Sequence, residues 1–194
     1  MITAILARHG ESEYSARGLC NGDIGVPVGL TARGRDEARR LAESLPRVDL
    51  CVTSEFQRAR ETADLAVDPS VPRLILSELN DPLVGRFEGA TVDEYRAWAA
   101  AHDSSATPEP GGESRHALVE RYARGFRLLL ARLEGTVLAV CHSLPIAYAL
   151  EARAGREPAV EMPFAEYATP YSFTRDELAS AAAFLEDWTA APSW

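Results

Sequence analysis

Short, largely apolar runs alternate along this chain with segments whose apolar residues recur at helical spacing. The short runs are typical of strands buried on both faces of a sheet. Strands are predicted at residues 2–7, 49–53, 73–76, 136–141 and 171–174, and helices at 31–45, 54–67, 91–101, 113–133, 144–154 and 176–188. Helical crossovers join parallel strands, so the predicted fold class is α/β, a three-layer α/β/α arrangement with a mostly parallel central sheet.

Side chains that cap helices support several of these boundaries. Thr31 and Ser54 are predicted N-caps, because a hydroxyl accepts a hydrogen bond from the first free backbone N–H groups of a helix. Thr91 and Glu94 have the spacing of a capping box. Pro46 ends the helix that starts at Thr31.

Composition restricts the class of protein. The 194 residues are 46% apolar and 25% charged, which predicts a single globular domain over residues 1–194. There is no run of about 18 apolar residues for a membrane span, and residues 1–7 resemble a strand more than a signal peptide. The net charge of -9 argues against a nucleic-acid partner but is compatible with a small phosphorylated substrate. The sequence makes no prediction about oligomeric state.

Three cysteines, without a C-x-x-C spacing, predict a reduced, cytoplasmic protein. Cys51 and Cys141 fall in apolar strands and are expected in the core. Cys20 falls in a loop, where we expect it to be more exposed.

Reactive side chains follow three of the predicted strands. Arg8 and His9 come directly after the first strand, Arg58 a few residues after the second, and His142 directly after the strand at 136–141. Ligands of parallel α/β sheets bind beyond the carboxyl ends of the strands, so these four side chains are expected at one site.

Together these residues predict phosphoryl chemistry. A neutral imidazole is a good nucleophile toward phosphorus, and neighbouring arginines keep His9 neutral through like-charge repulsion. The guanidinium groups of Arg8 and Arg58 match phosphate oxygens in a bidentate fork, and His142 can donate a further hydrogen bond. Gly10 is expected to leave room for a ligand beside the backbone.

These motifs resemble the histidine phosphatase superfamily, the phosphoglycerate-mutase-like proteins. The likeness covers roughly residues 2 to 150. It is carried by Leu6-Ala7-Arg8-His9-Gly10-Glu11-Ser12, Leu30-Thr31 with Gly34, Ser54-x-x-x-Arg58-Ala59-x-x-Thr62-Ala63, Gly85-Arg86-Phe87-Glu88-Gly89, Pro110-Gly111-Gly112-Glu113-Ser114 and Val140-Cys141-His142.

The resemblance implies a role for each matching residue. His9 would accept the phosphoryl group as a phosphohistidine, and Arg8, Arg58 and His142 would complete the phosphate pocket. Asp81 would protonate the leaving oxygen. The alternatives for this acid are Glu78 and Glu88, and Asn21 and Gly22 match positions that contact substrate or phosphate.

Three positions depart from the family pattern. Ser15 replaces a common Asn, which predicts weaker phosphate binding, although its hydroxyl still donates one hydrogen bond. Ser143 replaces a Gly and adds a hydroxyl, and Asp81 replaces the more common Glu, which places the proton about one methylene farther back.

The resemblance favours a phosphomonoester hydrolase without a metal or other cofactor. No H-x-x-x-H or Cys/His cluster predicts a metal site, and no Walker loop or GxGxxG predicts a nucleotide cofactor. The alternatives are a phosphomutase, which is usually longer than this chain, and a catalytically weak relative that binds a phospho-ligand or a partner. Loops at 18–29, 82–91 and 102–112 would select the substrate, with Leu19, Val26, Val28 and Leu83 as an apolar wall.

Overall fold

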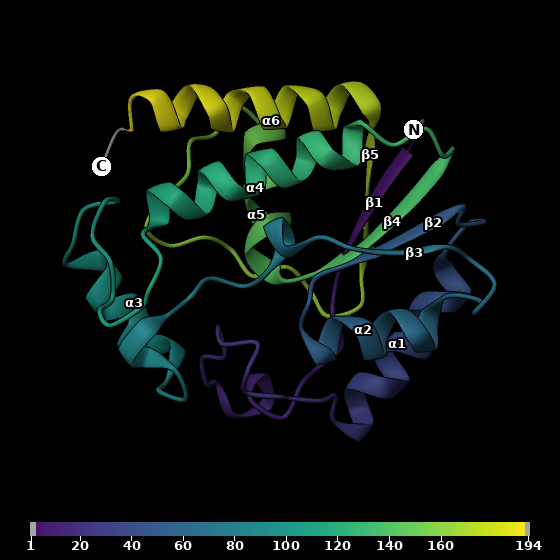
Figure 1. The fold of residues 1–194 in the computed structure, drawn as a ribbon, viewed down its shortest axis with the longest axis horizontal. Coiled ribbons are helices and arrows are strands. Elements are labelled where there is room, and N and C mark those ends of the chain that lie inside the picture. Colours follow the sequence, from purple (N-terminus) through teal and green to yellow (C-terminus); the bar gives the residue numbers. More distant parts are fainter. Residues whose placement is uncertain (1–2, 193–194) are drawn as a thin grey trace.

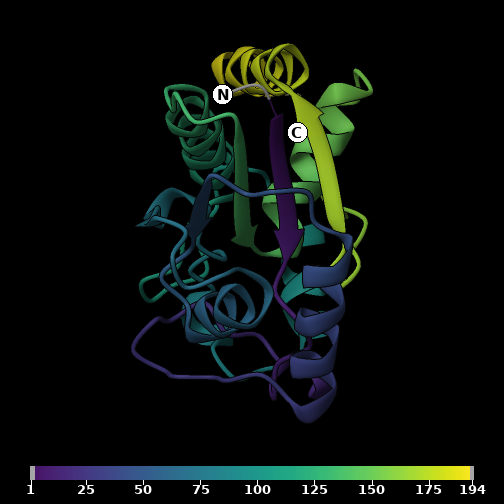
Figure 2. The ribbon, with the colours of Figure 1, turned by 90° about the vertical axis from the view of Figure 1, so that its right-hand side faces the viewer.

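A five-stranded sheet forms the centre of the protein in a computed structural model, which describes residues 3–192. The strands lie in the order β3-β2-β4-β1-β5. Neighbouring strands are parallel except for β5, which runs antiparallel beside β1 (Figures 1 and 2). Their bounds are Thr3–Arg8 for β1, Leu50–Thr53 for β2, Arg73–Ile75 for β3, Thr136–Cys141 for β4 and Pro170–Thr174 for β5.

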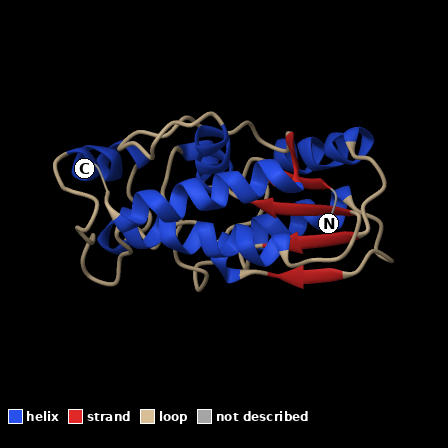
Figure 3. Ribbon diagram, turned by 90° about the horizontal axis from the view of Figure 1, so that it is seen from above, coloured by secondary structure: helices blue, strands red, loops and turns tan. Residues whose placement is uncertain are grey.

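Helices cover both faces of this sheet, as Figure 1 shows. Helices α1 (Ala32–Ser44) and α2 (Gln57–Ala66) pack together on one face. The opposite face carries α4 (Arg115–Leu130), α5 (Ser143–Arg153) and α6 (Arg175–Ala190). Helix α3 (Val92–Ala100) lies off the sheet, toward the end where the parallel strands finish (Figures 1 and 3). The predicted three-layer α/β/α class is therefore confirmed.

Strand β1 shows how one apolar run serves both layers. Its side chains alternate between the faces, so Ala4 and Leu6 join the buried cluster beneath α4, α5 and α6. Ile5 and Ala7 join the cluster beneath α1 and α2. A strand covered on both faces has to be apolar throughout, which explains the unbroken run in the sequence.

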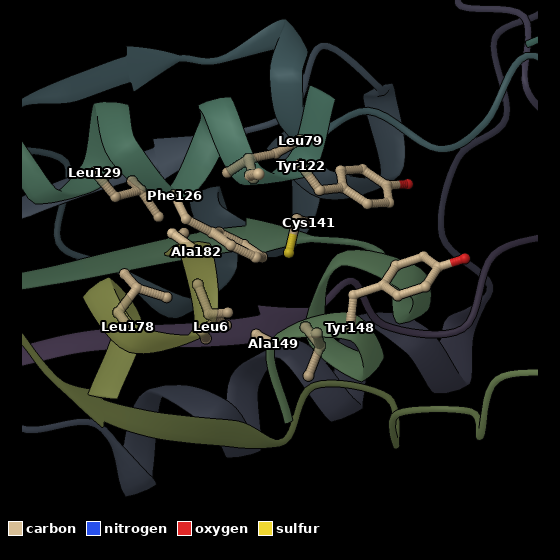
Figure 4. Packing of buried hydrophobic residues seen from close by; sticks show 14 of the residues in the cluster. Leu6, Leu79, Tyr122, Phe126, Leu129, Cys141, Tyr148, Ala149, Leu178 and Ala182 are labelled. Atoms are coloured by element: carbon tan, nitrogen blue, oxygen red, sulfur yellow. The ribbon is translucent and has the colours of Figure 1, made fainter. Parts of the chain in front are cut away.

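The larger cluster holds the sheet against α4 and α6. Figure 4 shows Phe126 and Leu129 of α4 and Leu178 and Ala182 of α6 packed close to Leu6 of β1. All five side chains are fully buried. Burial of each large side chain contributes about 1.5–3 kcal/mol, so this packing fixes the strand whose end carries His9.

Most predicted elements lie within a few residues of their expected bounds. The strand at 136–141 and the Thr91–Glu94 capping box are confirmed. The predicted N-cap at Ser54 is wrong, because α2 begins at Gln57 with Phe56 as its N-cap. Ile2, the predicted start of the first strand, lies outside the described residues. Among the described helices, none has the length and apolar character needed to cross a membrane.

Two glycines bring the end of β1 against the start of α1. A Cβ on Gly10 would lie 2.3 Å from the Gly34 carbonyl oxygen, and a Cβ on Gly34 would lie 2.0 Å from the Glu11 carbonyl oxygen. The expectation that Gly10 leaves room for a ligand is not met in this structure. The close approach that requires a glycine here is to the backbone of Gly34. The contact holds the turn that contains His9 against the first turn of α1.

Candidate active site

His9 lies at the carboxyl end of β1 and is only 3% exposed. Its Nδ1 is 2.7 Å from the Gly10 carbonyl oxygen, and its Nε2 is 3.2 Å from Arg58 Nε. A carbonyl oxygen can only accept, so Nδ1 carries the ring proton. The Nε2 atom then holds the lone pair and accepts the Arg58 N–H.

The surroundings of His9 keep its ring neutral. Burial lowers the pKa of His9 well below its usual value, and the positive charge of Arg58 lowers it further. His142 and Arg8 act in the same direction, whereas the Asp81 carboxylate opposes them. The ring is therefore available as a nucleophile at pH values where an ordinary histidine is protonated.

Arg58, in the first turn of α2, is held by three groups besides His9. Its guanidinium donates to the Asn21 side-chain oxygen at 2.5 Å, to the Asn21 carbonyl at 3.0 Å and to Asp81 Oδ2 at 2.7 Å. It also lies 4.1 Å from the centre of the Phe56 ring. Only 3% exposed, this cation is fixed beside the imidazole rather than free in solvent.

Arg8 presents a second fixed guanidinium to the same site. It stacks 3.7 Å from the centre of the Tyr167 ring, and its Nη1 donates to the Ala165 carbonyl at 2.9 Å. Its buried Nε has no hydrogen-bond partner among the described residues. An unpaired buried N–H is costly, so this atom marks a place for an acceptor from a ligand.

His142, the N-cap of α5, is fully buried and its ring centre lies 5.2 Å from that of His9. The hydroxyl of Ser54 is 2.8 Å from His142 Nε2, which explains why Ser54 does not cap α2. Burial lowers the pKa of His142 to about 4 despite the nearby Asp81.

The neighbours of His142 determine which nitrogen of its neutral ring carries the proton. Its Nδ1 is 3.1 Å from Asp81 Oδ2, so Nδ1 carries the proton and Nε2 accepts from the Ser54 hydroxyl. Within residues 3–192 this N–H makes no well-aligned hydrogen bond, and its nearest acceptor is the Asp81 carboxylate. Two unpartnered N–H groups, on Arg8 and His142, thus belong to the residues around His9.

Asp81 lies at the open side of this cluster, with its side chain 25% exposed. Burial would raise its pKa, but His142 and Arg58 outweigh that effect and hold the pKa well below its usual value. It lines the central cavity, whereas neither Glu78 nor Glu88 does. The geometry therefore favours Asp81 among the three acids considered from the sequence.

Arg121 of α4 fixes the backbone of the loop that carries Asp81. Its guanidinium donates to the carbonyl oxygens of Glu78 and Asn80, both at 3.0 Å, and lies 3.4 Å from that of Asp81. It is itself oriented by the Glu113 carboxylate at 2.7 Å. The position of the Asp81 carboxyl therefore depends on Arg121, although Arg121 does not line the cavity.

Asn21 and Gly22 bond to other residues of the site in this structure. Asn21 lines the cavity, but its oxygen atoms hold Arg58 and its Nδ2 donates to Glu88 at 2.9 Å. The Gly22 N–H donates to the same Glu88 carboxylate at 2.7 Å. In this structure Gly22 therefore has no free N–H for phosphate, and Asn21 holds Arg58 in place.

The two serines that depart from the family pattern both line the cavity. Ser15 Oγ accepts from the Ser12 N–H at 2.8 Å and donates to the Ser12 carbonyl at 3.0 Å. Ser143 Oγ accepts from the Ala165 N–H at 2.8 Å. Both hydroxyls stabilise local backbone, and the Ser143 bond ties α5 to the segment that supports Arg8.

A cavity of about 520 Å³ opens from His9. It is lined by Leu19 as predicted, but not by Val26, Val28 or Leu83. The expectation of an exposed Cys20 is wrong, since this thiol is buried in the cavity wall and burial raises its pKa to about 12. All three cysteines are free.

Most of the remaining wall comes from α3, α5 and the segment at 160–167. This segment connects α5 to β5 and was not predicted from the sequence as part of the site. A chemical signal was present in its aromatic residues, Phe164 and Tyr167, but no periodic pattern marks it.

A metal ion is a further candidate ligand, because donor atoms of His9, Asp81 and His142 lie within 4.8 Å of one another. However, Arg58 donates directly to both His9 Nε2 and Asp81 Oδ2. A divalent cation would have to displace this buried guanidinium or lie against it. The residues therefore do not fit a metal centre.

Comparison with known proteins gives one family. The sequence profile of the histidine phosphatase superfamily (branch 1) matches residues 4–175. A 2,3-bisphosphoglycerate-dependent phosphoglycerate mutase of Methylobacterium sp. is 32% identical over 156 residues, 66% of this chain and 73% of the relative. An adenosylcobalamin/alpha-ribazole phosphatase of Escherichia coli is 34% identical over 130 residues, 61% of this chain and 62% of the relative.

The solved structures agree on the fold. A phosphoglycerate mutase from Thermus thermophilus superposes with a TM-score of 0.67 and 28% identity over 88% of this chain and 92% of that one. The predicted phosphoglycerate-mutase-like fold is therefore confirmed. These relatives include both phosphatases and mutases.

Proposed function

This chain belongs to the histidine phosphatase superfamily (branch 1), and from that membership and the geometry of its site we propose that it hydrolyses phosphomonoesters through a phosphohistidine on His9. One observation carries the proposal. A neutral imidazole with its Nε2 lone pair lies among Arg58 and two buried, unpartnered N–H groups, those of Arg8 and His142. Such a set complements an anionic tetrahedral phosphoryl group with a nucleophile beneath it.

The phosphoryl oxygens would complete the hydrogen bonds that the protein leaves unmade. Arg8 Nε and His142 Nδ1 would each donate to one oxygen, and the Arg58 N–H would transfer from His9 Nε2 to another. The N-terminus of α5, which begins at Ser143 beside His142, adds the positive end of a helix dipole. Binding therefore frees the Nε2 lone pair at the same time as it neutralises the phosphoryl group.

The reaction then takes two displacements. His9 Nε2 forms a bond to phosphorus while the bond from phosphorus to the leaving oxygen breaks, and Asp81 passes to that oxygen the proton that the phosphate monoanion brings. Water next attacks the phosphohistidine and gives a proton to Asp81, which returns it to the departing phosphate. The bond between phosphorus and Nε2 breaks, which releases inorganic phosphate and restores the neutral imidazole.

Hydrolysis rather than transfer is supported by what surrounds the cavity. The residues between Gly89 and Gly112 form the nine-residue helix α3 and a loop, without a further element to close over the substrate and exclude water. A phosphomutase has to exclude water from its phosphohistidine until the substrate hydroxyl attacks. The mutase relatives keep this alternative as the second candidate function.

Turnover of para-nitrophenyl phosphate tests the proposal directly. We expect release of nitrophenol and inorganic phosphate, with activity retained down to about pH 5, since His9 is neutral well below the usual histidine pKa of about 6.5. Vanadate binding without turnover would instead indicate a phospho-ligand binding protein. Conversion of 3-phosphoglycerate to its isomer, faster than phosphate release, would indicate a mutase.

Chelation is expected to leave this activity unchanged. The Arg58 guanidinium already occupies the space between His9 and Asp81 that a divalent ion would need. Rates measured before and after dialysis against EDTA, and after addition of Mg²⁺, Mn²⁺ or Zn²⁺, should agree within about twofold. A loss that one of these ions restores would contradict the proposed mechanism.

A further inference from the structure

The cavity extends from the phosphate end into a part with a different character. Beyond Arg8, Arg58 and Asp81 its wall is mostly apolar. We propose that this part binds the leaving group of the substrate, and that the leaving group is an uncharged, ring-bearing alcohol; this inference rests on the proposed phosphatase function. The residues that form the apolar part are Leu19, Val92, Tyr95, Leu144, Tyr148, Val160 and Met162.

The size of the cavity supports a bulky leaving group. Pockets of about 300–1,000 Å³ typically enclose ligands of drug size, and this one measures about 520 Å³. A phosphorylated three-carbon acid would leave water against much of the apolar wall. A ring would displace that water and gain hydrophobic contact, with Tyr95 and Tyr148 available for stacking.

Two cationic side chains belong to this part of the wall, and Arg115 is the more firmly held by the protein. Arg115 is 6% exposed and donates to the carbonyl oxygens of Ala99 and, at 2.6 Å, His102. Arg96 lies 4.3 Å from the centre of the Phe164 ring, and its Nη2 is 3.5 Å from the Met162 carbonyl.

A carboxylate on the substrate would have to compete with backbone carbonyls for Arg115. It would also approach Asp93, an acidic residue of the same wall. Both effects favour an uncharged leaving group over the anionic one of a phosphorylated acid.

The Tyr148 hydroxyl is available to orient an uncharged ligand. Figure 4 shows the hydroxyls of Tyr122 and Tyr148 pointing away from the packed cluster. Tyr122 donates to the Asn80 carbonyl at 3.0 Å. The Tyr148 hydroxyl belongs to the cavity wall and makes no hydrogen bond to any described residue. A neutral hydroxyl at an apolar wall suits an ether, hydroxyl or ring nitrogen of the substrate.

Three alkyl phosphates distinguish binding of the leaving group from differences in the intrinsic reactivity of the ester. Propyl phosphate, 2-phenylethyl phosphate and 3-phosphonooxypropanoate all release a primary alcohol, so the leaving oxygen is closely matched and the remaining group differs. We expect kcat/KM for the phenylethyl ester to exceed that of the propyl ester by about tenfold or more, and the carboxylate ester to be the poorest. A carboxylate ester as good as propyl phosphate, or no preference for the ring, would overturn the inference.

Variants of the wall locate the effect. Val160→Asp, at a half-buried position, should reduce the phenylethyl-to-propyl ratio at least fivefold, and Met162→Ala should lower it in the same direction. Leu133→Asp is the matched control, because Leu133 is 93% exposed and lies outside the cavity. Propyl phosphate turnover reports whether each variant folds. An unchanged ratio in folded Val160→Asp would contradict the proposed location.

Hydrolysis of para-nitrophenyl phosphate distinguishes failure of the leaving-group proposal from failure of the phosphatase proposal. If it is hydrolysed and the alkyl series shows no ring preference, only the leaving-group inference fails. If it is not hydrolysed by the wild-type protein, the phosphatase proposal fails, and this inference, which rests on it, fails with it.

Discussion

Replacing His9 with alanine is expected to reduce phosphatase turnover by roughly 10⁴-fold or more, the largest effect of any single substitution in this protein. The proposed reaction goes through a bond between phosphorus and His9 Nε2, and this residue is the only described histidine whose ring faces the cavity. His142 cannot replace it, because its Nε2 lone pair accepts from Ser54 and its Nδ1 carries the ring proton. The measurement is release of nitrophenol from para-nitrophenyl phosphate.

Two controls make this result specific to the chemistry. His102→Ala removes an exposed histidine that only stacks on Trp98 and bonds its carbonyl, and it should leave turnover unchanged. Quenching the wild-type reaction in alkali with radiolabelled substrate should trap label on the protein, and His9→Ala should trap none. Residual activity within tenfold of wild type, in a variant with an unchanged melting temperature, would remove His9 from the nucleophile role.

The strand ends are the part of this site that could be predicted from sequence. Arg8, His9 and His142 each follow an apolar run directly, and parallel strands deliver the residues at their carboxyl ends to one edge. Strand β4 has its predicted bounds because Thr136–Cys141 is apolar after its first residue and is followed by a polar histidine. At these strand ends the local sequence pattern and the topology of the sheet agree, so the sequence alone predicts where the residues lie.

The partners that orient these residues could not be predicted in the same way. Ser54 was expected to cap α2, yet its hydroxyl bonds His142, 88 residues away. Gly22 matches a position that contacts substrate or phosphate, and its N–H donates to Glu88, 66 residues away. Hydroxyl and amide groups satisfy whichever neighbour the tertiary structure provides, and no local spacing records that choice. For the same reason the segment at 160–167, without regular structure, was not expected in the cavity wall.

Asp81→Asn is expected to separate substrates by their leaving groups. Asparagine keeps an oxygen to accept from Arg58, which Asp81 does at 2.7 Å, but it has no proton to give. Turnover of propyl phosphate should fall about 10²–10³-fold, whereas para-nitrophenyl phosphate, whose leaving group needs no proton, should fall less than about tenfold. Glu78→Gln is the matched control, since Glu78 lies outside the cavity. Equal losses on both substrates would exclude Asp81 as the acid.

The pH dependence of the same variant tests how Asp81 obtains its proton. His142 and Arg58 hold the pKa of Asp81 well below its usual value, so the free protein carries an ionised carboxylate at neutral pH. The proton needed by the leaving oxygen then has to arrive with the substrate, as the phosphate monoanion, which loses its last proton near a pKa of about 6. For propyl phosphate, kcat/KM should therefore decrease about tenfold per pH unit above pH 6.

Below that pH the rate should stay level, because His9 has a pKa well below 6.5 and remains neutral. Asp81→Asn should lose the decrease above pH 6, since no carboxylate remains to carry the proton from one oxygen to the other. If wild-type kcat/KM instead rises between about pH 5 and 7, the nucleophile would be a histidine that titrates in the ordinary range. Burial and the fixed positive charges of Arg58 and Arg8 would then not be lowering its pKa as this geometry requires.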